Sequence, residues 1–145
     1  MRPLNKIDFI CIHCADSKKS MDVDVETLRR WHVEENGWSD IGYHYFIKFN
    51  GSLHKCRDTK YQGAHCKAIN QNSIAVCLEG GFNGEDNFTV PQLNQLKSLI
   101  NSLKIQYPNA ALVGHNHFDE KSCPSFDVVA WYDKATAPPQ RIGFI

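Results

Sequence analysis

The chain has 145 residues, a length that fits one domain. Apolar residues make up 42% and charged residues 22%, which excludes a disordered or collagen-like chain. Sixteen Lys and Arg balance sixteen Asp and Glu, so the net charge gives no general attraction to nucleic acid or to an anionic membrane. No apolar run reaches the length of a membrane span, and the first eight residues lack the apolar segment of a secretory signal. We therefore expect a protein made in the cytoplasm, a monomer, with no nucleic-acid partner and no membrane insertion.

The N-terminal half combines strand and helix patterns. Near-continuous apolar runs with β-branched residues are typical of buried strands, and apolar residues at a spacing of three to four are typical of an amphipathic helix. Two short runs on either side of Asn50-Gly51 indicate a hairpin with a tight turn. These patterns predict a strand over 7–13, a helix over 25–33 with Asp24 as its N-cap, and hairpin strands over 44–49 and 52–56.

The C-terminal half continues the interleaving of strands and helices. The patterns predict a buried strand over 73–78, a long amphipathic helix from Pro91 to about 107, a short strand over 111–113 and a short helix over 126–133. The fold class is therefore α/β (or α+β), with a central mixed β-sheet flanked by about three helices. We assign 1–134 to a single catalytic domain and 135–145, which contains Pro138-Pro139, to a C-terminal tail.

The chain is rich in soft metal ligands, with six Cys and seven His. Without an export signal the cysteines are expected to be reduced thiols. His13 ends the first strand, and His115 and Cys123 bracket the loop after another strand. If those strands are neighbours in the sheet, the three side chains converge, and three ligands leave a fourth zinc position for water. His117 is an alternative to His115 that the residues alone leave open.

Four blocks of the sequence carry a further signal: Phe9-Ile10-Cys11-Ile12-His13-Cys14, Gly42-Tyr43-His44-Tyr45-Phe46-Ile47, Asn72-Ser73-Ile74-Ala75-Val76-Cys77-Leu78, and Gly114-His115 through Lys121-Ser122-Cys123-Pro124-Ser125-Phe126-Asp127. Taken together, they resemble the zinc amidases among the small phage lysozymes, which belong with the peptidoglycan recognition proteins. The similarity spans about residues 7–133, with the blocks in the same order and on matching element types.

The resemblance implies a function and a set of roles. It implies a zinc-dependent N-acetylmuramoyl-L-alanine amidase, an endolysin-like enzyme that cuts the amide between the muramic acid lactyl group and L-Ala of bacterial peptidoglycan. It makes His13, His115 and Cys123 the Zn²⁺ ligands, and it prefers His115 over His117 because the family places this histidine eight residues before the cysteine. Tyr43 and Lys121 fall on the catalytic positions. The loop that carries His65 lines the substrate groove, so we expect His65 to contact the glycan or the peptide of the substrate.

Three alternatives compete with this one, of which a regulator of a nucleic-acid enzyme has no basic patch to support it. Cys123 could be a thiolate nucleophile at a helix N-terminus, with His13 or His115 as its base. Alternatively, the chain could be a non-catalytic peptidoglycan-binding module, but binding alone requires none of Tyr43, Lys121 and Cys123. We expect the enzyme to reach the cell wall after disruption of the host membrane.

Overall fold

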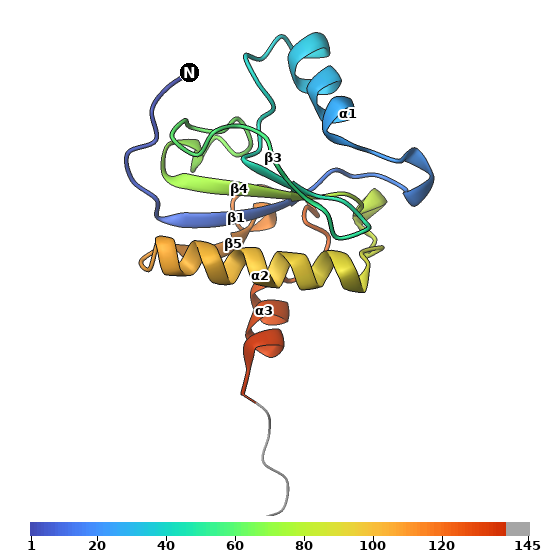
Figure 1. Cartoon of the computed structure of the whole chain (residues 1–145), viewed down its shortest axis with the longest axis vertical. Helices are drawn as coiled ribbons and strands as arrows, with labels where there is room; N and C mark the ends of the chain where they lie inside the picture. Colours follow the sequence, from blue (N-terminus) through green and yellow to red (C-terminus); the bar gives the residue numbers. More distant parts are fainter. Residues whose placement is uncertain (139–145) are drawn as a thin grey trace, which may run out of the picture.

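A computed structural model describes residues 1–138. It contains a five-stranded mixed sheet, with helices arranged around it (Figure 1). The strand order is β3-β2-β4-β1-β5. The pairs β1–β4, β1–β5 and β2–β4 are parallel, and only the hairpin β2–β3 is antiparallel. The strands are β1 (Phe9–Cys14), β2 (Tyr45–Ile47), β3 (Leu53–Lys55), β4 (Ser73–Leu78) and β5 (Ala111–Gly114).

Three α-helices accompany the sheet within the described residues. They are α1 (Val25–Arg29), α2 (Val90–Gln106) and α3 (Val128–Thr136). Helix α1 runs directly into a π-helical segment, η2 (Arg30–Glu35), and four short 3₁₀ turns complete the fold: η1 (Lys19–Met21), η3 (Asn70–Asn72), η4 (Phe82–Gly84) and η5 (His115–His117). This architecture confirms the predicted mixed sheet with about three helices.

The helices begin at side chains that cap their free N–H groups. Asp24, Thr89 and Asp127 accept hydrogen bonds from backbone N–H groups in the first turns of α1, α2 and α3. The cap at Asp24 confirms the predicted start of the first helix. The last helix begins at Val128 and ends at Thr136, so it crosses the predicted domain boundary at 134. Of the predicted tail, residues 139–145 lie outside the described residues.

The two faces of the sheet bury different sets of side chains. On one face, β1 and β4 pack against α2 and α3, and alternate residues of β1 such as Ile10 and Ile12 belong to this larger core. On the other face, Phe46 and Cys77 pack with Leu28 of α1, which lies on the opposite side of the sheet from α2 (Figure 1). Because side chains alternate along a strand, His13 points to the face opposite Ile12. The candidate site is therefore on the side of the sheet away from α2.

No helix within residues 1–138 is long and apolar enough to cross a membrane.

Candidate active site

The site forms at one end of the parallel strands β1 and β5. In their register Ile12 is the partner of Gly114, so His13 and His115 follow adjacent positions on neighbouring strands. Cys123 returns to the same place from the loop after η5. The nearest ligand atoms of these three side chains all lie within 4.8 Å of one another. We predicted that the three side chains converge if the two strands are neighbours in the sheet, and β1 and β5 are neighbours.

The donor geometry fits a tetrahedral cation. Cys123 Sγ lies 3.8 Å from His13 Nδ1, close to the separation of about 3.6 Å that a nitrogen and a sulfur ligand have on one tetrahedral zinc. The imidazole rings of His13 and His115 have centroids 4.6 Å apart. The backbone N–H of Cys14 donates to Cys123 Sγ over 3.2 Å, which holds the sulfur toward the two rings. Two imidazoles and one thiolate form a donor set that zinc prefers.

Burial controls the protonation of these groups. It lowers the pKa of His13 well below its ordinary value, and the neighbouring His65 and His115 lower it further, so the ring stays neutral with a lone pair to offer. A hydrogen bond with the Cys14 thiol, together with burial, raises the pKa of the Cys123 thiol.

Tyr43 and Lys121 line the same cavity, which has a volume of about 490 Å³. The ring of Tyr43 lies 5.2 Å from that of His13, centroid to centroid. Burial raises the pKa of the Tyr43 phenol well above its ordinary value, and the nearby thiols of Cys77 and Cys123 add to the effect, so the hydroxyl keeps its proton. Lys121 is exposed at the rim and brings a positive charge to the cavity.

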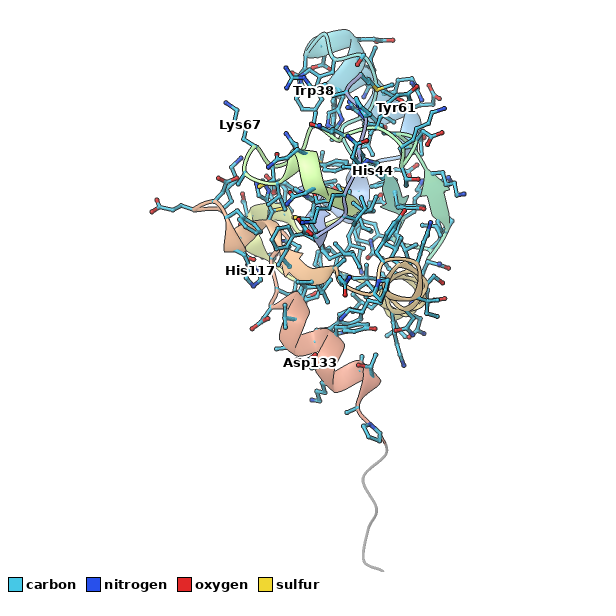
Figure 2. All side chains as sticks on the ribbon, turned by 90° about the vertical axis from the view of Figure 1, so that its left-hand side faces the viewer. Trp38, His44, Tyr61, Lys67, His117 and Asp133 are labelled. Atoms are coloured by element: carbon cyan, nitrogen blue, oxygen red, sulfur yellow. The ribbon has the colours of Figure 1, made fainter. Side chains whose placement is uncertain are left out.

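The structure distinguishes the two histidines of the η5 turn. His115 is buried, with 6% of its surface exposed, and belongs to the cluster with His13 and Cys123. His117 is exposed, and its Nδ1 lies 2.8 Å from the backbone nitrogen of Gly114 (Figure 2). His115 is therefore the histidine placed to share a metal ion with His13.

His65 lines the cavity, but both of its ring nitrogens have partners inside the protein. Nδ1 lies 2.8 Å from His13 Nε2, and Nε2 lies 2.9 Å from Ser73 Oγ. A direct role of His65 in substrate binding stays a prediction. Such a contact would involve the carbon atoms of the ring, because both nitrogens already have partners.

Sequence reasoning missed several residues around the cluster. Asp119 places Oδ2 at 2.5 Å from His115 Nε2, Ser73 contacts His65, and Cys14 contacts Cys123. Cys11 with His13 and His65, and Cys66 with His115 and Asp119, form two further groups with metal-ligand spacing in the described residues. The spacing of Asp119, four residues after His115 in a 3₁₀ turn and loop, is the one sequence signal that could have revealed a partner.

Solved structures define the class of fold. The endolysin amidase LysCS from Clostridium intestinale superposes with a TM-score of 0.80 at 24% identity, covering 90% of this chain and 83% of LysCS. Bumblebee PGRP-SA superposes with a TM-score of 0.76 at 25% identity, covering 86% of this chain and 79% of PGRP-SA. The fold is therefore the α/β fold that amidases share with peptidoglycan recognition proteins.

The sequence match is more specific than the fold. Residues 3–126 match the N-acetylmuramoyl-L-alanine amidase family, and the chain belongs to that family. The endolysin of Klebsiella phage KP32 is 43% identical over 129 residues, covering 86% of this chain and 85% of the relative. The endolysin of Escherichia phage T7 is 42% identical over 131 residues, covering 88% of this chain and 86% of the relative. These findings confirm the predicted family, fold class and enzyme class.

Proposed function

We propose that this chain is a zinc-dependent, endolysin-like amidase that hydrolyses the bond between the lactyl group of muramic acid and L-Ala in bacterial peptidoglycan. The observation that carries the proposal is the convergence of His13, His115 and Cys123 within 4.8 Å of one another, in a cavity that also holds Tyr43 and Lys121. The endolysin relatives of about 40% identity support the same substrate class and an action on the cell wall.

In this proposal His13, His115 and Cys123 hold the metal. Zn²⁺ bound there supplies Lewis acidity, which brings the pKa of a water molecule near neutrality and polarises the scissile carbonyl. The three protein ligands leave one position open, as hydrolytic zinc sites require. The lone pairs of the neutral His13 ring and the N–H of Cys14 on Cys123 are the features of this chain that suit the role.

Lys121 and Tyr43 act on the substrate rather than on the metal. As water adds to the amide carbonyl, negative charge develops on its oxygen, and the ammonium of Lys121 stabilises that charge from the rim of the cavity. Tyr43 keeps its proton because burial raises the pKa of its phenol. It is therefore a hydrogen-bond and proton donor, suited to the water or to the leaving amine of L-Ala, and not a base.

The proposal is tested by mass spectrometry of the soluble products from purified peptidoglycan, with and without a strong chelator. Free stem peptides beginning with L-Ala, lost on chelation and restored by zinc, would support the bond, the reaction and the metal together. Intact peptidoglycan that nevertheless binds the protein would favour the alternative, a non-catalytic binding module. Chelator-insensitive release that alkylation abolishes would favour Cys123 as a nucleophile.

We further propose that the enzyme reaches the wall only after the host membrane is disrupted, and that it acts as a monomer.

A further inference from the structure

A chain of buried hydrogen bonds begins at His13 and ends at a backbone carbonyl. His13 Nε2 lies 2.8 Å from His65 Nδ1, and His65 Nε2 lies 2.9 Å from Ser73 Oγ. The Ser73 hydroxyl donates to the carbonyl oxygen of Ile69 over 2.6 Å. The loop before β4 thereby connects to the end of β1, across 52 positions in sequence between His65 and His13.

The carbonyl end fixes the direction of every bond in this chain. A carbonyl oxygen can only accept, so the single hydroxyl proton of Ser73 is used on Ile69. The Ser73 oxygen then accepts from Nε2–H of His65. A neutral imidazole has one N–H and one lone pair, so the lone pair of His65 is on Nδ1 and accepts from Nε2–H of His13. The lone pair of His13 is consequently on Nδ1, the nitrogen that faces Cys123 Sγ at 3.8 Å.

We infer that His65 is a positioning residue which, with Ser73, fixes the tautomer and orientation of His13 so that Nδ1 is presented as a metal ligand. The inference rests on the proposed zinc site, because its benefit is realised when a metal binds there. Partners of this kind raise the basicity of ligating histidines and limit their rotation. Asp119 has a comparable position beside His115, but its side chain is 45% exposed, whereas Ser73 is fully buried.

The surrounding structure holds His65 in this position. The side-chain oxygen of Asn70 accepts the backbone N–H groups of both His65 and Cys66, each over 2.9 Å. At Gly63 an added Cβ would lie 2.8 Å from Cδ2 of the His65 ring, so a glycine is needed for the ring to occupy this place. Both restraints act on a residue whose two ring nitrogens already have partners inside the protein.

One group competes for the same proton. Cys11 Sγ also lies near His13 Nε2, at 3.4 Å. Sulfur is a weak hydrogen-bond acceptor, whereas the His65 nitrogen is a good acceptor at a shorter distance. Cys11 is therefore a secondary partner, and it does not change the tautomer that the chain from Ile69 requires.

The direct test is NMR spectroscopy of the metal-free protein near neutral pH, with ¹⁵N-labelled histidine. Long-range ¹H–¹⁵N correlations report which ring nitrogen carries the proton. We expect His13 as the Nε2–H tautomer and His65 also as the Nε2–H tautomer. A His13 ring protonated on Nδ1, or an even mixture of tautomers, would overturn the inference. This result does not depend on zinc, so a failure of the proposed function leaves the test valid and is recognised separately, by the absence of zinc binding.

A pair of variants tests the consequence for the metal. His65→Phe keeps a ring but removes both nitrogens, and we expect zinc affinity, measured by competition with a chromogenic chelator, to fall about 10- to 100-fold. His65→Asn places an amide oxygen two bonds from Cβ, where it can accept from His13, and we expect it to restore most of the affinity and the Nε2–H signal of His13. His54→Phe, on the hairpin strand β3, is the matched control and should bind zinc like wild type.

Two outcomes of the variant experiment would count against the inference. Zinc binding by His65→Phe as tight as wild type would overturn it, and so would a loss of affinity in His65→Asn as large as in His65→Phe. Thermal unfolding of each metal-free variant shows whether it is folded. If His65→Phe does not fold, the tautomer of His13 in the wild-type protein decides the question.

Discussion

In the proposed mechanism Lys121 stabilises the oxyanion but does not bind the metal. Lys121→Ala should therefore lower the catalytic rate without loss of the metal. Lys121 is exposed on the loop before Cys123, and its backbone N–H donates to the carbonyl of Asp119 over 2.8 Å, a bond that alanine retains. Its side chain has no hydrogen bond or ion pair within residues 1–138. The free energy of unfolding should therefore change by no more than about 0.5 kcal/mol.

The expected effect on catalysis is much larger. Loss of one group that stabilises a developing oxyanion typically slows kcat by about 100- to 1,000-fold, or roughly 2.7–4 kcal/mol. Lys121 is the one lysine that lines the cavity with His13 and Cys123, so no other lysine within residues 1–138 is placed there to replace it. The assay is the initial rate of release of stem peptides beginning with L-Ala, beside zinc content measured by elemental analysis.

Lys67→Ala is the charge-matched control for this experiment. Lys67 extends from the surface (Figure 2) and lines the adjacent hollow of about 520 Å³ rather than the cavity with Cys123. Its kcat should remain near wild type. A Lys121→Ala enzyme with near-normal turnover, or one that has lost its zinc, would refute the reasoning about this residue.

Three further predictions concern Cys123, His65 and Gln92. Cys123→Ala removes one of three proposed ligands, so bound zinc and the increase in melting temperature on adding zinc should both disappear; retention of stoichiometric zinc would contradict the assignment. Burial lowers the pKa of His65 from 6.5 to about 3, so between these values the unfolded chain binds more protons than the folded one. The free energy of unfolding of the metal-free protein should therefore fall as pH drops from about 6.5, by up to about 1.4 kcal/mol per pH unit for this group, in urea titrations. Gln92 is fully buried and donates to the carbonyls of Ile47 and Glu79; Gln92→Leu should destabilise the fold by about 1–3 kcal/mol for each carbonyl left unpaired, measured by the same method.

Much of the fold could be predicted because each element has a strong local pattern. The apolar run of β1 and the helical spacing of α2 reflect burial on one or both faces, which the order of residues records directly. Asp24 and Asn50-Gly51 likewise act on their immediate neighbours. The end of the last helix was less predictable, because no glycine or proline stands at position 135 to stop it.

The sequence by itself determined the candidate ligand types, the positions of His13 and His115 at the ends of strands, and, through four blocks in order, the family. Spacing could not choose between His115 and His117, because that choice depends on which ring the η5 turn buries against β1. Nor could it pair His65 with His13, since the hydrogen bond joins residues 52 positions apart. Only the packing of the loop before β4 over the end of β1 brings their nitrogens to 2.8 Å, and a contact between distant segments leaves no periodic signal in either one.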